Sequence, residues 1–316
     1  KINVWFTMSK VLFADAKLER LEKEYSLPYK FVKLLDMSPL KNIVAEGNIV
    51  AIKIHVGDMH HGGYRTIRPI FVKILVDYIR KLGGIPFITD TWGLRHVIVG
   101  IENGYGYGIV NAPIIPVSGI KETDLVKIRV PNPLRINEVE IGTSVFYADV
   151  LINFAHSKGH PSSGYGGAVK NISMGCVGPN TRSAIHNLER DDPTGRAFQE
   201  GLADAFHAVI LNKQSKVFHI NYIMDVVPTC DCAPWSDIPI IPDVGIMTSD
   251  DVVALEKATI DLINQAPVMP NSIAEKAGMK PGENKFFIIH GKDPYIQVEA
   301  LYRKGLGKMD YEIVRV

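Results

Sequence analysis

Strand-like and helix-like segments alternate along this chain of 316 residues, and the alternation limits the folds that it can adopt. Apolar, β-branched runs of strand length are expected at 48–56, 85–90, 150–155, 216–227, 243–247, 285–290 and 311–316, the last as an edge or terminal strand. Helical spacing of apolar residues is found over 69–83, near 165–173, and over 194–212, 250–264 and 295–304. Strands separated by helices of this length predict an α/β fold, with a mostly parallel sheet covered by helices on both faces.

The domain organisation follows from length and from the lack of linkers. No internal repeat or low-complexity tract interrupts the pattern, and 316 residues suffice for a sizeable core. We expect one α/β domain over 8–316, or two closely packed lobes. Met8 is a candidate natural start, which would make residues 1–7 an N-terminal extension.

Composition argues against several classes of partner. The net charge is +1 and no Lys/Arg cluster stands out, so nucleic acid is not an expected partner. No apolar run approaches the roughly 18 residues that cross a bilayer, and the first residues lack the pattern of a secretory signal. Membrane association is therefore not expected. The three cysteines form no disulfide framework, so the expected compartment is the cytoplasm.

A glycine-rich segment, 156–186, is the first candidate site. It follows the apolar run 148–155, and ligands of open α/β sheets bind at the carboxyl ends of strands. Its chemistry-bearing residues are His156, His160, Lys170, Cys176 and His186, with Gly164, Gly166 and Gly167 expected to let the backbone approach a cofactor. Lys170 stands where an apolar helix begins, so we expect burial to depress its pKa and make the amine a nucleophile or a base. A tight connection with capping histidines is the alternative.

The second candidate is the pair Cys230 and Cys232, which also follows a predicted strand. Two cysteines at this spacing can chelate a soft metal, and Cys176 with a histidine would complete four ligands. Cysteines are also commonly buried small hydrophobes, and that alternative stays open.

Two further polar clusters follow strands. His60, His61, Arg65 and Arg68 precede the amino end of the helix at 69–83, a place suited to a carboxylate or phosphate, although a solvated loop explains them equally. Asp90 ends the strand at 85–90 near Arg95 and His96, and we expect it to cap the next helix.

Missing motifs narrow the chemistry. The chain has no GxGxxG after the first strand, no Walker loop, no GxSxG and no HExxH. Hydride transfer on a standard dinucleotide fold, P-loop phosphoryl transfer and serine hydrolysis are therefore disfavoured.

Three stretches, 53–91, 148–176 and 225–264, resemble a domain-of-unknown-function family whose members are described as iron–sulfur centre proteins. Typical members carry a ferredoxin-like insertion shortly after the segment that matches Cys176–His186. Here 187–194 runs directly into a predicted helix, and three cysteines cannot form the two clusters of such an insertion. A separate ferredoxin is the partner that this departure leaves open.

A more distant similarity is to the lactate racemase superfamily, whose enzymes use a nickel pincer nucleotide. There a histidine precedes a GGxK segment and a later histidine follows. The resemblance implies that Lys170 tethers a nucleotide-type cofactor, that His186 ligates the metal and that His160 is an acid/base. Residues 66–69 resemble the nucleotide-binding TRP segment, but Arg65 stands where an acidic residue is expected.

The leading hypothesis is a metal- or metal-cofactor-dependent enzyme, isomerase- or lyase-like or an oxidoreductase, that acts on a small anionic molecule. His160 and Lys170 would be catalytic, and the cofactor would contact Lys170, the three glycines, Arg65 and Arg68. The expected metal ligands are His156, Cys176, His186, Cys230 and Cys232, with iron, nickel and zinc not distinguished. The alternatives are an iron–sulfur electron-transfer protein and a non-catalytic binding scaffold.

Overall fold

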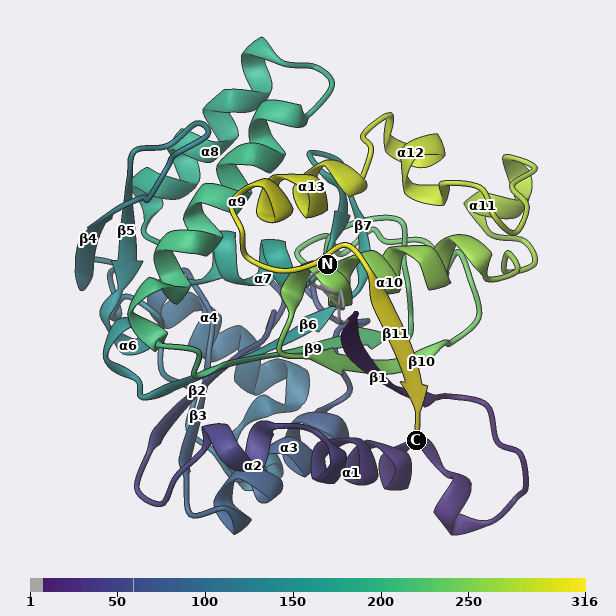
Figure 1. Cartoon of the computed structure of the whole chain (residues 1–316), viewed down its shortest axis with the longest axis horizontal. Helices are drawn as coiled ribbons and strands as arrows, with labels where there is room; N and C mark the ends of the chain where they lie inside the picture. The colour runs from purple at the N-terminus through teal and green to yellow at the C-terminus, as the bar shows by residue number, and fades with distance from the viewer. Residues whose placement is uncertain (1–7, 59) are drawn as a thin grey trace, which may run out of the picture.

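A seven-stranded sheet with the strand order β11-β1-β10-β9-β6-β2-β3 forms the centre of the molecule, as the computed structural model shows for residues 8–58 and 60–316 (Figure 1). The strands are β1 (Ser9–Asp15), β2 (Ile49–Lys53), β3 (Ile85–Thr89), β6 (Val150–His156), β9 (Val217–Ile223), β10 (Gly245–Ser249) and β11 (Tyr311–Arg315). Four of the neighbouring pairs are parallel, and the two pairs made by β10 are antiparallel. The expected mostly parallel sheet is confirmed.

The central strands are buried on both faces. All seven residues of β6 and all seven of β9 are buried, which explains why both strands are continuous apolar runs rather than alternating ones. Helices α1 (Leu27–Met37) and α3 (Pro69–Lys81) cover one face (Figure 1). Helices α7 (Ala168–Gly175), α9 (Arg196–Ile210), α10 (Val252–Gln265) and α13 (Tyr295–Arg303) cover the other. Helices on both faces are therefore confirmed as well.

Helix α3 shows how local sequence sets these elements. Pro69 occupies its first turn, where the missing N–H has no helical partner, and Phe71, Val72 and Leu75 pack into the core. The helix ends before Gly83, whose φ of 87° is the left-handed conformation that glycine adopts readily.

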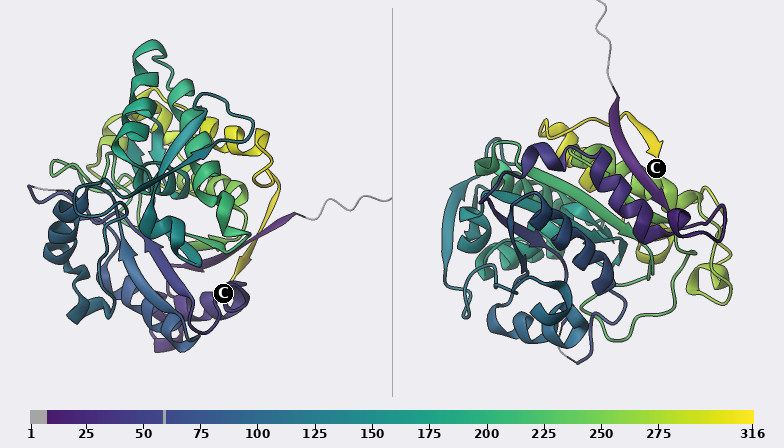
Figure 2. Two further views of the ribbon diagram at one scale, coloured as in Figure 1. Left: turned by 90° about the vertical axis from the view of Figure 1, so that its left-hand side faces the viewer. Right: turned by 90° about the horizontal axis from the view of Figure 1, so that it is seen from below.

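Both chain ends of the described region lie in the same sheet. The edge strand β11 runs parallel to β1, as Figure 2 shows, and confirms the strand expected at 311–316. The sequence pattern did not indicate β1, which is antiparallel to β10. Residues 1–7 lie outside the described residues.

The strand expected at 285–290 is wrong, because this segment forms helix α12 (Lys285–His290). The Asn284 side chain accepts a hydrogen bond from the backbone N–H of Phe287, and Gly291 ends the helix at a φ of 66°. A short apolar run does not distinguish strand from helix, and these two capping residues decide it here.

The glycine-rich segment contains more regular structure than its sequence indicates. After β6, a hairpin of β7 (Lys158–His160) and β8 (Gly164–Gly166) leads into α7, and α8 (Pro179–Asp191) follows. The other elements are α2 (Leu40–Ile43), α4 (Gly93–Gly100), α5 (Tyr107–Val110), α6 (Thr143–Tyr147), α11 (Ile273–Lys276) and the hairpin of β4 (Leu125–Arg129) and β5 (Glu138–Gly142). Within the described ranges no helix is both long and apolar enough to cross a membrane.

Candidate active site

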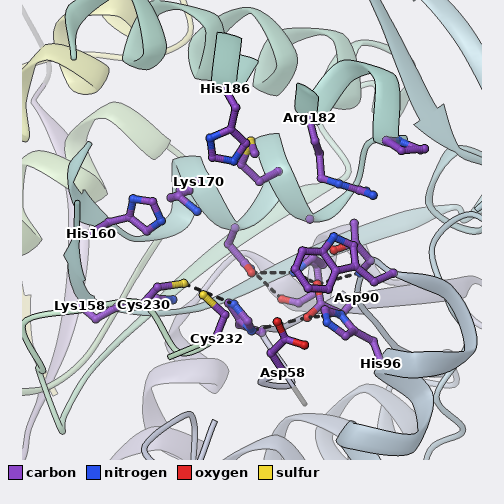
Figure 3. Close-up of a pocket in the computed structure, with 18 of the residues that line it drawn as sticks. Asp58, Asp90, His96, Lys158, His160, Lys170, Arg182, His186, Cys230 and Cys232 are labelled. Carbon is purple, nitrogen blue, oxygen red and sulfur yellow. Dashed lines mark hydrogen bonds and ion pairs between the residues drawn. The ribbon is translucent and has the colours of Figure 1, made fainter. Parts of the chain in front are cut away.

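A cavity of about 420 Å³ opens where β2, β3, β6 and β9 end (Figure 3). Its charged, polar and sulfur-bearing lining comes from segments far apart in the sequence. These residues are Lys53, His55, Asp58, Asp90, Thr91, His96, Lys158, His160, Lys170, Asn171, Met174, Arg182, Ser183, His186, Cys230 and Cys232. Residues of the glycine-rich segment and the cysteine pair thus line the same cavity.

Lys53 and Asp90 form a buried ion pair in the wall of the cavity. Their side chains approach to 2.8 Å, and Lys53 also donates to the carbonyl of Ile54 at 2.6 Å and to Asn171 Oδ1 at 2.9 Å. The pKa of Asp90 is held well below its usual value: burial opposes ionisation, but Lys53 and nearby histidines outweigh it. Gly175 makes room for this pair, because a Cβ there would lie 2.4 Å from Lys53 Nζ.

Two histidines flank this carboxylate. His55 Nδ1 lies 3.7 Å and His96 Nδ1 3.5 Å from Asp90 Oδ2. His96 is 4% exposed, and neither of its ring nitrogens has a hydrogen-bond partner in the described residues. The expectation that Asp90 caps the next helix is wrong, since Trp92 is the N-cap residue of α4 and the Asp90 side chain instead accepts from the backbone of Val56 and Thr91.

A second buried carboxylate, Asp231, fixes the cysteine turn. It accepts from His156 Nδ1 at 2.7 Å and pairs with Lys158 at 2.9 Å. Burial raises the pKa of Asp231, but these two partners lower it more, so the carboxylate is ionised. Since Asp231 lies between the two cysteines in the chain, its anchoring leaves both thiols on the cavity side (Figure 3).

The two thiols have opposite proton affinities. A hydrogen bond from Cys232, with His160, His55 and Lys170 nearby, holds the pKa of Cys230 well below its ordinary value, whereas the same bond and burial raise the pKa of Cys232. Cys230 is therefore the sulfur of the pair that loses its proton more readily. A thiolate among cationic groups is the reactive form of cysteine.

Lys170 and His160 lie near Cys230 at the same end of the cavity (Figure 3). Burial lowers the pKa of Lys170, as the sequence led us to expect; Cys230 and Cys232 oppose this effect, and Lys158 and Lys53 add to it. In the described part of the chain no carboxylate pairs with its amine. Burial and the neighbouring Lys170 lower the pKa of His160 to about 4, so its ring is neutral at pH 7.

The hydrogen bonds of His160 indicate its tautomer. The backbone N–H of Ser162 donates to Nδ1 at 3.2 Å, so this nitrogen is the acceptor and Nε2 carries the proton. His160 and Lys158 alternate along β7, which places both side chains on one face of that strand.

A buried carboxylate positions the helix that carries Lys170. Glu256 accepts from the backbone N–H groups of Ala168 and Val169, the first residues of α7, and from Asn221 and Tyr165. It satisfies donors that a helix start otherwise leaves unpaired. The start of α7 is therefore already occupied by this chain's own carboxylate.

Helix α8 closes one side of the cavity with Arg182 and His186. Arg182 donates to the carbonyl of Val177 and to Glu122, both at 2.6 Å. His186 lies at the cavity rim, half exposed, with Nδ1 at 2.8 Å from Glu189.

The structure keeps several residues of the expected site away from the cavity. Cys176 is fully buried in the core, where burial raises its pKa to about 12. His156 borders the site through Asp231, and its Nε2 faces the carbonyls of Met224 and Asp225. Arg65 and Arg68 pair with Asp225 instead of lining the cavity.

The three expected cofactor glycines are packed against the chain itself. A Cβ at Gly164 would lie 2.3 Å from the carbonyl oxygen of Lys292, and one at Gly167 would lie 2.0 Å from the Tyr165 hydroxyl. At Gly166 it would lie 3.5 Å from Lys170 Cδ, an ordinary contact. The close approach that these positions require is thus to neighbouring protein atoms.

Sequence reasoning missed Lys53, Lys158 and Asp231 as parts of the site. One signal was available: a lysine inside an apolar run is rarely buried without a partner, and Lys53 ends such a run. The partners themselves, Asp90 and Asp231, are 37 and 73 residues away along the chain and carry no local signal.

The donor set does not fit a metal ion held by this chain alone. Among the residues that the structure describes, no group of three or more His, Cys, Asp or Glu side chains is arranged to bind one. Four-ligand iron–sulfur binding has the further obstacle that Cys176 lies outside the cavity. The expected metal stays a prediction from sequence.

Family comparison agrees with the resemblance seen in the sequence. Residues 50–261 match the family described as Domain of unknown function (DUF362). The chain belongs to this family. No curated protein matches it.

Two solved structures are similar over part of the DUF362 chain. One is the lactate racemase apoprotein from Thermoanaerobacterium thermosaccharolyticum, with 18% identity and a TM-score of 0.46 over 69% of this chain and 51% of that one. The other is a Thermotoga maritima protein, with 10% identity and a TM-score of 0.46 over 63% of this chain and 50% of that one. The chain thus spans about half the length of each.

Proposed function

We propose that this cavity is the active site of an enzyme that acts on a small anionic molecule. The supporting observation is a lysine amine, that of Lys170, which has no carboxylate partner in the described residues and lies beside the neutral His160. The cavity's two other lysines, Lys53 and Lys158, are neutralised by Asp90 and Asp231.

An anion bound here interacts first with Lys170. Burial strengthens the attraction between the anion and the Lys170 ammonium group. Because burial also lowers the pKa of Lys170, the neutral amine forms more readily than at an exposed lysine. Lys170 accordingly has two roles open to it, as the charge that holds the substrate or as the amine that bonds to a carbonyl carbon.

His160 is the proposed proton-transfer group. With Nδ1 accepting from Ser162, its Nε2 exchanges a proton with the bound molecule. His96 is buried at the other end of the cavity, and its Nε2, which has no hydrogen-bond partner in the described residues, offers a second polar contact to the same molecule.

The test measures binding and proton transfer separately. Calorimetric titration with a panel of small carboxylates and inorganic phosphate should yield at least one binder. Lys170→Gln should weaken that binder about 10- to 100-fold, the effect of one charged hydrogen bond of about 1.5–3 kcal/mol. Lys41→Gln, which removes an exposed lysine on α2, is the matched control and should bind like the wild type.

Proton transfer is followed by NMR of the bound molecule's carbon-bound hydrogens in D₂O. The wild type should exchange them, and His160→Gln should bind the anion but lose the exchange. Undiminished binding by Lys170→Gln would refute the proposed anion site. Binding without any exchange would favour the non-catalytic scaffold.

A further inference from the structure

The cysteine pair is a chemical feature of the cavity that the proposed acid/base function does not use. Cys230 and Cys232 both line the cavity, and their sulfur atoms lie side by side in it (Figure 3). No group of three or more His, Cys, Asp or Glu side chains in the described residues is arranged to hold a metal ion. Another use of two adjacent thiols therefore has to be considered.

The backbone at this point forms a turn that contains both cysteines. The N–H of Ala233 donates to the carbonyl of Cys230 at 2.9 Å, which closes a turn over 230–233. A turn shortens the separation of residues two apart relative to an extended strand, and a disulfide needs Cα atoms within about 4.4–6.8 Å. The side chain between the two cysteines, that of Asp231, is held by His156 and Lys158 and therefore does not lie between the two sulfurs.

The surroundings of the pair differ from those of an inert buried cysteine. His55 Nε2 lies 3.8 Å from Cys230 Sγ, and Lys158 and Lys170 line the same cavity. Cys230 is 6% exposed and Cys232 is partly exposed, so a small molecule in the cavity reaches the pair. The third cysteine, Cys176, has no such access.

We propose that Cys230 and Cys232 undergo thiol–disulfide exchange with a small anionic disulfide that enters the cavity. In its deprotonated form, Cys230 Sγ attacks one sulfur of the small disulfide, forms a mixed disulfide and releases the first small thiolate. Cys232 then attacks Cys230 Sγ, which forms the Cys230–Cys232 disulfide and releases the second small thiolate, and the Cys232 proton passes to a released thiolate. The protein dithiol loses two electrons and the small disulfide gains them.

The experiment uses three small disulfides that differ in charge: dithiodiglycolate (anionic), 2-hydroxyethyl disulfide (neutral) and cystamine (cationic). The reduced 316-residue chain is mixed with each, quenched with an alkylating agent and mapped by mass spectrometry without reduction. Each rate is divided by the rate of the same disulfide with a free model thiol, which removes differences in intrinsic reactivity. We expect a Cys230–Cys232 disulfide in the wild type, formed at least about tenfold faster with the anion than with the cation.

Three single variants identify the role of each sulfur. Cys232→Ser should accumulate a mixed disulfide on Cys230, Cys230→Ser should form no internal disulfide and react far more slowly, and Cys176→Ser should behave like the wild type. The wild-type map alone overturns the proposal if both thiols remain alkylated after exposure to all three reagents. A pair protected by a stoichiometric soft metal in the purified protein, or a rate order in which the cation leads, would overturn it as well. None of these outcomes depends on the anion titration or on D₂O exchange, so this proposal and the proposed function fail separately.

Discussion

Replacing Lys53 by Met should be one of the most destabilising single changes in this chain. The ammonium group is 1% exposed and lies 2.6–2.9 Å from three acceptors, namely Asp90 Oδ1, the Ile54 carbonyl and Asn171 Oδ1. Methionine has nearly the same length and fills the space, so the change removes the charge and its hydrogen bonds without creating a large cavity. Asp90 is left ionised in the interior with two backbone donors, those of Val56 and Thr91.

The loss of stability expected for Lys53→Met follows from the burial of the pair formed by Lys53 and Asp90. Removing one partner of a buried ion pair costs about 3–5 kcal/mol, because the remaining charge is uncompensated. The exposed pair of Lys127 and Glu138, 3.4 Å apart with side chains 65% and 54% exposed, provides the comparison. Lys127→Met should change the free energy of unfolding by no more than about 1 kcal/mol.

The assay is urea unfolding at pH 7, followed by tryptophan fluorescence and far-UV circular dichroism. The double variant Lys53→Met/Asp90→Asn should be more stable than the sum of the two single effects predicts, by about 1–3 kcal/mol, because no buried charge then lacks a partner. Additivity of the two changes within about 0.5 kcal/mol would refute the reasoning, as would a Lys53→Met cost no larger than that of Lys127→Met.

Two further predictions concern acid sensitivity and the start of α7. Burial lowers the pKa of His219 to about 3, so the unfolded state binds a proton that the folded state excludes, and stability should fall by about 1.4 kcal/mol per pH unit from pH 6.5 downwards. Urea midpoints at pH 7, 6 and 5 should decline less steeply for His219→Phe, and an unchanged decline contradicts the assignment. Gly167→Ala would place a Cβ 2.0 Å from the Tyr165 hydroxyl and 2.6 Å from Glu256 Oε1, which should cost about 1–3 kcal/mol in thermal or urea unfolding. Gly108→Ala, where a Cβ meets nothing within 4 Å, is the control, and equal effects of the two changes would exclude the steric explanation.

The strands and helices that could be predicted are those whose periodicity is strong and local. Helix α3 and strand β6 carry their own apolar patterns and, for α3, their own terminal Pro and Gly, so both lie close to the expected ranges. The strand prediction for 285–290 failed because a run of four apolar residues, 286–289, fits a strand as well as a helix. The helix over 285–290 depends on Asn284 and Gly291, which flank it.

In the candidate site, too, some residues could be predicted from the local sequence and others could not. His160, Lys170, Cys230 and Cys232 were predicted because each follows a strand, and the carboxyl ends of neighbouring parallel strands meet at one edge. Arg65 and Arg68 also follow a strand, yet they form ion pairs with Asp225 and do not line the cavity. That partner is more than 150 residues distant, and its position depends on where β9 ends.

The sequence by itself determined the alternating elements, the α/β class and the edge of the sheet at which polar residues gather, because side-chain periodicity and chain connectivity are local properties. Tertiary structure alone decided which charges meet. It neutralised Lys53 and Lys158 with Asp90 and Asp231, left Lys170 beside a neutral His160, and buried Cys176 away from the cysteine pair. The reason is physical: the ionisation and reactivity of a side chain depend on burial and on neighbours within a few ångströms, and those neighbours come from distant parts of the chain.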